Sequence, residues 1–214
     1  MKRRHFLIAA AMVPLAPLAN SVFAQEAFKA GKDFLELDKP VPVDAPPGKV
    51  EVIEFFSYNC PHCAAFEPQL EIWTRQLPSI ASFRRVPVPF VGSDVEAKQR
   101  MYYALQALGK EDEFRPRIFR AIHQEHQRLF GDDAILAWAD KQPGLDGKKF
   151  AEAYHSFSTM TRAKRATQTT SDFKVAGVPA LGIAGRWYAD GETAGSPERA
   201  LQVTSFLIRE ASRA

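Results

Sequence analysis

The chain has 214 residues, of which 46% are hydrophobic and 25% charged, a composition typical of a globular protein with enough apolar material for a sizeable core. Its 28 lysines and arginines stand against 25 aspartates and glutamates, but three of the basic residues fall within the first 24 positions, so the remainder is formally neutral. This balance gives no electrostatic argument for nucleic-acid binding, and the length fits one or two domains.

The first 24 residues have the pattern of a secretory signal peptide. A basic start from Lys2 to Arg4 precedes an apolar run over 6–18, and small residues fit a cleavage site after Ala24. The apolar run is too short and too interrupted by proline to favour a membrane anchor. We therefore expect an exported protein. The paired arginines leave both the general and the twin-arginine export route open.

The next segment alternates between strand and helix patterns. Residues 34–37 are typical of a short edge strand, and residues 50–57 of a central strand, because the latter are apolar on both faces. Residues 61–77 predict a helix that has proline in its first turn and a second proline, Pro68, that disturbs its hydrogen bonding. Residues 81–89 predict another strand, which ends among prolines.

The following segment is mostly helical before strands return. Apolar residues at helical spacing predict four or five helices from about residue 94 to 170. A hairpin is predicted across Gly185, and residues 197–212 predict a closing amphipathic helix. This order places a helical block between the two halves of an α/β domain. We divide the mature chain accordingly into a first half, a helical insertion and a second half, at 25–92, 93–170 and 171–214.

The chain has two cysteines, Cys60 and Cys63, which lie where the central strand gives way to a helix. A four-residue ring adds little stability, so redox chemistry explains the pair better in an exported protein. Helix N-terminal amides stabilise a thiolate on Cys60, and His62 adds positive charge nearby. Cys63, one turn later, is placed to attack a mixed disulfide on Cys60. A stabilised thiolate also weakens the disulfide, which favours a donor of disulfides.

A metal site is the main alternative for the cysteines. His123 and His126 form a His-x-x-His pair on a predicted helix, but they lie about 60 residues beyond Cys63, far outside zinc-finger spacing. We interpret them as solvated helix histidines. We expect no metal, and no cofactor other than the redox-active Cys60–Cys63 disulfide.

Two further residues are candidates for the site. Glu54 shares a strand face with apolar residues, so we expect its carboxylate to be buried, to have a raised pKa and to move a proton to or from Cys63. Pro179 follows Val178 just before the hairpin. From the residues alone a trans peptide bond is expected there, because cis X–Pro bonds are uncommon.

Three segments resemble the DsbA family of periplasmic disulfide oxidases: residues 54–63 with Cys-Pro-His-Cys, residues 177–180 with the family's cis-proline loop, and residues 37–41 with its N-terminal strand and turn. The resemblance covers nearly all of the mature chain. It implies an α/β protein with a thioredoxin fold and an inserted all-helical domain.

The family resemblance also implies roles for the site residues. Cys60 exchanges with substrate and Cys63 resolves, while Pro61 and His62 between them tune the pair. The Val178–Pro179 bond is implied to be cis, beside the cysteines, where it holds an extended substrate by backbone hydrogen bonds. One departure concerns the acid at position 54, whose basic partner is often lysine in the family and is here Arg85. Arginine does not give up its proton, so a simple Lys–Glu proton pair is not expected.

The implied activity is that of a periplasmic oxidase that gives the Cys60–Cys63 disulfide to newly exported polypeptides and is reoxidised by a quinone-linked, DsbB-like membrane partner. Nothing in the sequence indicates more than a monomer. An isomerase or reductase of the same fold is the first alternative. Such isomerases usually carry an added N-terminal dimerisation domain, for which the residues before the first strong strand leave too little length. A peptide-binding module with inactive cysteines is the second alternative.

Overall fold

A five-stranded mixed sheet with the order β1-β5-β4-β2-β3 forms the centre of the protein. The computed structural model describes residues 28–213, and the predicted signal peptide with its cleavage site lies outside them. Strand β2 runs parallel to β3 and antiparallel to β4, and the β4–β5 hairpin carries β1 at its edge. The strands are β1 (Leu35–Glu36), β2 (Val50–Phe56), β3 (Ala81–Pro87), β4 (Ala180–Ile183) and β5 (Trp187–Asp190).

Eight helices complete the described part of the chain. They are α1 (Pro61–Thr74), α2 (Val95–Ala107), α3 (Glu111–His123), α4 (Gly131–Asp140), α5 (Gly147–Tyr154), α6 (Phe157–Asp172), α7 (Gly191–Ala194) and α8 (Pro197–Ala211). The sequence predicted all of them except the four-residue α7. Helix α1 ends at Thr74 rather than at residue 77 and continues through Pro68. Within residues 28–213, no helix combines the length and the apolar character needed to cross a membrane.

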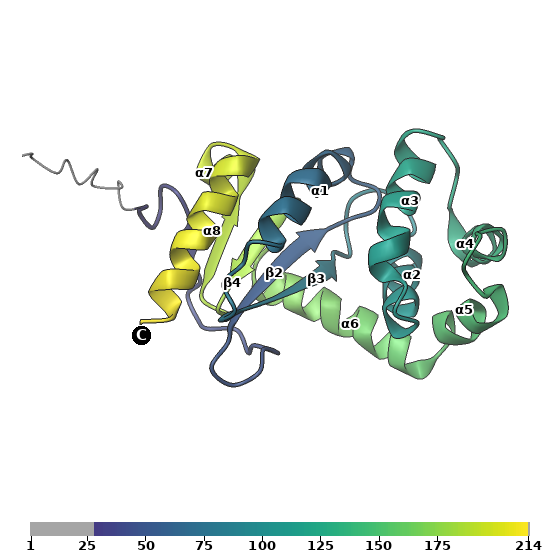
Figure 1. The fold of residues 1–214 in the computed structure, drawn as a ribbon, viewed down its shortest axis with the longest axis horizontal. Helices are drawn as coiled ribbons and strands as arrows, with labels where there is room; N and C mark the ends of the chain where they lie inside the picture. The colour runs from purple at the N-terminus through teal and green to yellow at the C-terminus, as the bar shows by residue number, and fades with distance from the viewer. Residues whose placement is uncertain (1–27, 214) are drawn as a thin grey trace, which may run out of the picture.

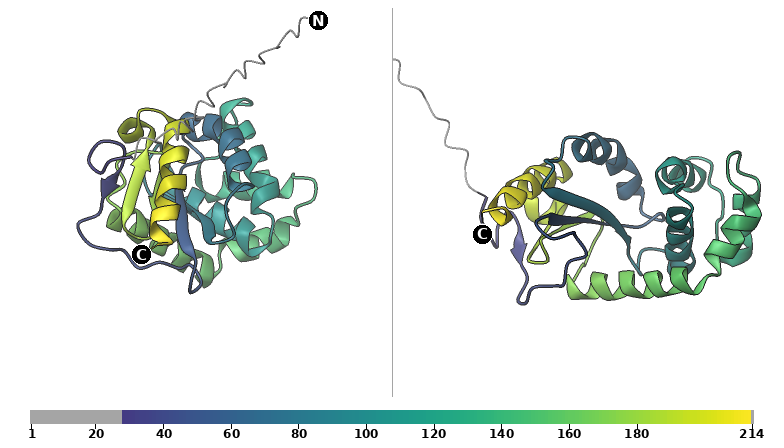
Figure 2. Two further views of the ribbon diagram at one scale, coloured as in Figure 1. Left: turned by 60° about the vertical axis from the view of Figure 1, so that its left-hand side comes forward. Right: turned by 60° about the horizontal axis from the view of Figure 1, so that its bottom comes forward.

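The helices form layers around the sheet. Helices α1 and α8 lie on one side of it and α6 on the other, while α2–α5 gather beyond one end (Figure 1). The right-hand view of Figure 2 shows the same layers. Helices α2–α6 all lie between β3 and β4 in the chain, so the predicted order of strands and helical block is confirmed. The boundary at residue 92 falls between β3 and α2, and that at 170 falls inside α6; this division stays a prediction.

Strand β2 divides the core because each of its faces is covered. Val50 and Val52 pack in one hydrophobic cluster with residues of α1 and α8. Ile53 and Phe55 belong to the other cluster, which extends through the helices beyond the sheet. Every residue of β2 is buried, as predicted for a central strand. The site described next therefore begins at the end of a fully buried strand.

Strand β3 ends where the prolines predicted it would. Its pairing with β2 runs to Pro87, and the amide of Val88 adds one more bond to the Phe56 carbonyl at 2.8 Å. Pro89 has no amide to donate, so the ladder cannot continue regularly. The chain then turns away to α2.

Candidate active site

Cys60 and Cys63 lie at the start of α1, directly after the central strand. Cys60 is the N-cap of α1, and its Sγ accepts a hydrogen bond from the Cys63 amide at 3.3 Å. The same sulfur donates to the Val178 carbonyl at 3.5 Å. Both cysteines are free thiols, and only 4% of Cys60 and none of Cys63 is exposed. The structure is thus that of the reduced dithiol.

The surroundings of the two thiols shift their pKa values in opposite directions. A hydrogen bond from the Cys63 side chain, helped by the backbone amides of Cys63 and His62 and by the charge of His62, lowers the pKa of Cys60 to about 6. Burial, reinforced by the neighbouring Cys60 sulfur, raises the pKa of Cys63 far above its ordinary value. The predicted lowering of the pKa of Cys60 agrees with this result. His62 contributes less to that lowering through the charge of its exposed ring than through its backbone amide. At neutral pH the arrangement favours a thiolate on Cys60 beside a protonated Cys63.

The pH dependence of alkylation follows from this separation. In the reduced protein, iodoacetamide should label Cys60 alone, with a rate that rises through a midpoint near pH 6, where the pKa of Cys60 lies, because the thiolate is the nucleophile. Mass spectrometry of quenched samples gives the rate at each pH. The same protein in denaturant should label both cysteines with a midpoint near 8.5, the value of a free thiol. A folded-state midpoint at that ordinary value would contradict thiolate stabilisation.

The Val178–Pro179 peptide bond is cis. The trans bond expected from the residues alone is therefore wrong, and the cis bond implied by the family resemblance is confirmed. General frequencies favour trans at an isolated X–Pro pair, and only the tertiary context beside Cys60 distinguishes this one. The bond lies immediately before β4, which pairs with the central strand and so fixes the Val178 carbonyl at the Cys60 sulfur.

Glu54 is fully buried on β2 and pairs across the sheet with Arg85 on β3. The Arg85 Nε and Glu54 Oε2 atoms are 2.8 Å apart, but neither atom has hydrogen-bond geometry, so the contact is a close ion pair. Burial, with repulsion from Glu67, raises the pKa of Glu54 to about 8, while Arg85 and Arg115 oppose the shift. The charge of Glu54 in turn contributes to the raised pKa of Cys63. Burial and a raised pKa were predicted; the proton-transfer role stays a prediction.

A second buried arginine extends this charged group and was missed by sequence reasoning. Only 3% of the Arg115 side chain is exposed, and its Nε donates to Glu67 at 2.7 Å. Its other nitrogens contact Glu111 at 2.8 Å, Asp112 at 3.0 Å and Glu71 at 3.2 Å. These contacts link α1, which carries the cysteines, to α3. The (i, i+4) spacing of Glu111 and Arg115 was a signal for part of the cluster.

The loop before the cysteines is held from two sides. Asn59 donates to the carbonyls of Val91 and Ser93 at 3.0 Å each. His123 Nε2 lies 2.9 Å from the Tyr58 carbonyl and is partly buried there, so the interpretation of His123 as a solvated helix histidine is wrong. His126 is exposed and lies beyond the end of α3. Among residues 28–213, no cluster of three or more histidine, cysteine or acidic side chains is arranged to hold a metal ion.

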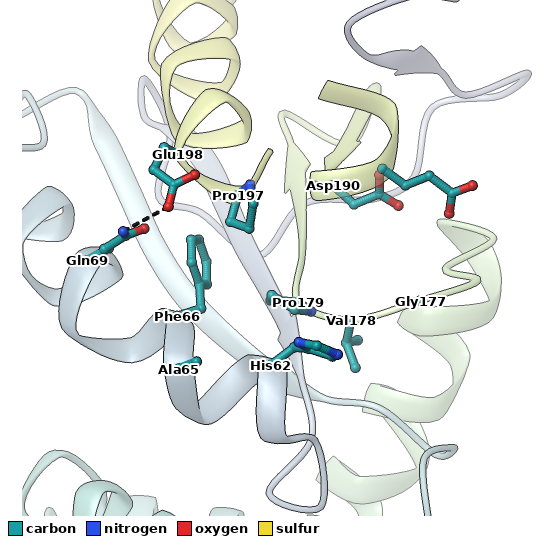
Figure 3. A pocket seen from close by; sticks show the side chains of 12 residues that line it. His62, Ala65, Phe66, Gln69, Gly177, Val178, Pro179, Asp190, Pro197 and Glu198 are labelled. Carbon is teal, nitrogen blue, oxygen red and sulfur yellow. Dashed lines mark hydrogen bonds between the residues drawn. The ribbon is translucent and has the colours of Figure 1, made fainter. Parts of the chain in front are cut away.

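A groove of about 400 Å³ begins beside the cysteines. It is walled by α1, by the loop 177–179 and by the segment from the end of β5 to the start of α8. Figure 3 shows His62, Val178 and Pro179 at one end, and Gln69 with Glu198 at the other. The Cys60 sulfur contacts Val178, so it lies next to the end of the groove that His62, Val178 and Pro179 form.

A thioredoxin-type sheet, a Cys-x-x-Cys pair at a helix N-terminus and a cis-proline facing the first cysteine define a thiol–disulfide oxidoreductase. Comparison with known proteins shows to which family of thiol–disulfide oxidoreductases the chain belongs. A family profile described as "DSBA-like thioredoxin domain" matches residues 51–199, and the chain belongs to the DsbA family.

Named relatives and solved structures agree with this assignment. The chain is 35% identical over 204 residues, 95% of each chain, to "Thiol:disulfide interchange protein DsbA" of Pseudomonas aeruginosa. It is 38% identical over 203 residues to the protein of the same name from Bordetella parapertussis, covering 94% of this chain and 93% of the relative. The crystal structure of Pseudomonas aeruginosa DsbA superposes with a TM-score of 0.81 at 35% identity, covering 87% of this chain and 97% of that one. The expected fold, a thioredoxin fold with a helical insertion, is confirmed.

Proposed function

We propose that this protein is a periplasmic thiol–disulfide oxidase that gives the Cys60–Cys63 disulfide to newly exported polypeptides. The observation that carries the proposal is the separation of the two thiols, with the pKa of Cys60 lowered to about 6 mainly by a hydrogen bond from Cys63 and that of Cys63 raised by burial. Stabilising the Cys60 thiolate favours the dithiol over the disulfide, so the oxidised protein is driven to accept electrons. The redox-active disulfide is the only oxidant required, and no separate cofactor is proposed.

The transfer proceeds through a mixed disulfide. A substrate thiolate attacks the Cys60 sulfur of the oxidised protein, the Cys60–Cys63 bond breaks, and the Cys63 sulfur leaves and takes up a proton. A second substrate thiolate then attacks the substrate sulfur of the mixed disulfide and releases Cys60 as a thiolate. The substrate has lost two electrons and gained a disulfide. Of its two protons, one is taken up by Cys63 and the other passes to solvent, so the reduced pair consists of the Cys63 thiol and the Cys60 thiolate.

The neighbouring residues assist these two steps. Glu54 supplies or takes the proton of Cys63 from within the core, since its raised pKa keeps the protonated form available near neutral pH. Arg85 stays charged throughout and tunes Glu54 without exchanging protons. The backbone of Val178 and Pro179 pairs with an extended substrate beside the Cys60 sulfur. Pro61 and His62 hold and polarise the first turn of α1. A quinone-linked, DsbB-like membrane protein restores the disulfide, and the enzyme works as a monomer.

The reduction potential of the Cys60–Cys63 pair tests this function. Equilibration with glutathione buffers, followed by thiol trapping, should give a value well above that of thioredoxin, about −270 mV. DsbA proteins are themselves the standard example of such oxidising pairs, so the direction alone is our prediction. A value near that of thioredoxin would instead favour the reductase alternative and would require a source of electrons rather than a quinone-linked oxidant.

A further inference from the structure

The groove beside the cysteines has an apolar floor. Phe66 contributes a nearly buried ring, and Ala65, Pro179 and Pro197 complete the floor with small or rigid side chains. Such a floor suits an apolar side chain of an extended polypeptide. It lies next to the point where a substrate cysteine must approach the Cys60 sulfur.

The rim of the same groove is acidic. Asp190, Glu192 and Glu198 line it together with His62, and no lysine or arginine among residues 28–213 does. A hydrogen bond from Gln69 to Glu198, 2.8 Å long, is the main cause of a pKa of Glu198 below its usual value, so this carboxylate is ionised at neutral pH. Asp190 is fixed in place because it accepts bonds from the Thr193 amide and the Tyr188 hydroxyl, at 2.7 Å each.

Glu192 differs from the other two acids because it is exposed and makes no hydrogen bond or ion pair with any described residue. Its charge is therefore available to a ligand. Three carboxylates around an apolar floor create a local negative potential, although the mature chain is formally neutral overall. Charge complementarity then points to a ligand that combines a basic and an apolar side chain.

We propose that this groove selects polypeptide segments that carry lysine or arginine, next to an apolar residue, close to the cysteine being oxidised. The inference rests on the proposed oxidase function and names the substrate class that the same site prefers. The basic side chain lies along the acidic rim with Glu192 and Glu198, and the apolar side chain lies over Phe66. Acidic segments are disfavoured because like charges meet in the groove.

The test uses three peptides of one apolar sequence with two cysteines, which differ only in carrying two lysines, two glutamines or two glutamates beside the first cysteine. The rate of their oxidation by the disulfide form of the full protein is measured by acid quenching and mass spectrometry. The lysine peptide should react faster than the glutamate peptide. Part of that ratio reflects the charge effect on the peptide's own thiol, so the comparison is made between proteins. In Glu192→Gln/Glu198→Gln the ratio should fall about fivefold at low salt, and by less at about 1 M salt, where the Debye length is about 3 Å.

The matched control is Glu96→Gln/Glu152→Gln, which removes two exposed carboxylates from α2 and α5 and changes the net charge equally. This variant should keep the wild-type ratio. Replacing Glu198 could also disturb the start of α8, where it lies in the first turn. The single variant Glu192→Gln loses no internal contact and should still lower the ratio, which separates the charge effect from such a disturbance. Equal ratios in all these proteins, or a preference for the glutamate peptide, would overturn the charge selection. Failure to oxidise any of the peptides would instead contradict the oxidase function itself.

Discussion

Replacing Cys60 by serine should reduce disulfide transfer to the uncatalysed rate, whereas Cys63→Ser should leave the protein covalently trapped on its substrates. Cys60 is the sulfur with the lowered pKa, held by the Cys63 side chain and the first amides of α1, and it faces the Val178 carbonyl. Cys63 is fully buried, so substrate has no direct access to it. Cys63→Ser has no disulfide to give, but its Cys60 thiolate can still attack a disulfide already present in a substrate, and the mixed disulfide so formed persists because Cys63 is no longer there to release it. Non-reducing electrophoresis of cell extracts would display the adducts.

The control for this pair of variants is their fold, followed by circular dichroism and by the midpoint of unfolding of the reduced forms. Serine is close in size to cysteine, so both variants should keep the reduced fold. The adducts of Cys63→Ser should disappear with dithiothreitol and be absent in the double variant. A peptide-binding module with inactive cysteines would behave differently, since Cys60→Ser would then retain full biological activity. Adducts formed by Cys60→Ser alone would show that Cys63 is the exposed nucleophile instead.

The features predictable from sequence are those with a local or periodic cause. Strand β2 is apolar on both faces, and the structure places it in the middle of the sheet with every residue buried. The position of Cys60 between this strand and a helix that starts with Pro61 predicted an N-terminal thiolate site, and Cys60 is the N-cap of α1. The burial of Glu54 followed from the same two-faced strand.

The features that sequence reasoning missed depend on contacts between distant segments. Arg115 contacts Glu67 across 48 residues of chain, and no periodic pattern places a buried cation on α3 opposite a buried acid on α1. His123 looked like a surface residue until the fold brought it to the Tyr58 carbonyl, 65 residues away. The cis form of Val178–Pro179 was implied only by the family resemblance of residues 177–180, because the general frequencies of X–Pro bonds favour trans.

Two competing effects decide whether Glu54 is ionised or protonated: its ion pair with Arg85 favours the carboxylate, and its burial favours the neutral acid. If Glu54 is ionised and paired with Arg85, removing its charge leaves a buried cation without its partner and destabilises the protein by about 3–5 kcal/mol. If burial dominates, Glu54 is protonated at neutral pH and its amide replacement resembles the native state. Arg85 also lies 3.9 Å from Glu67 and from Asp112, so it keeps acidic neighbours in either case.

We expect Glu54→Gln to stabilise the reduced protein by an amount that grows as the pH rises. Burial raises the pKa of Glu54 from 4.5 to about 8 in the folded state. Between these values the unfolded chain loses its proton while the folded one keeps it, so the wild-type free energy of unfolding falls with rising pH. Each pH unit above 4.5 lowers the wild-type free energy of unfolding by about 1.4 kcal/mol, which amounts to about 3 kcal/mol by pH 7. Glutamine cannot ionise, so the free energy of unfolding of the variant does not fall in this way as the pH rises.

Urea unfolding of the reduced wild type and of Glu54→Gln from pH 4.5 to 8 measures this difference, with the exposed Glu96→Gln as a control that should shift little. The same variant should exchange disulfides more slowly near neutral pH, by up to about a hundredfold, because an amide neither gives nor takes the proton of Cys63. Lower stability at pH 7 would mean that the ion pair with Arg85 dominates and that Glu54 is ionised. Unchanged exchange rates across the same range would remove the proton-transfer role while leaving Cys60 and Cys63 as the reacting pair.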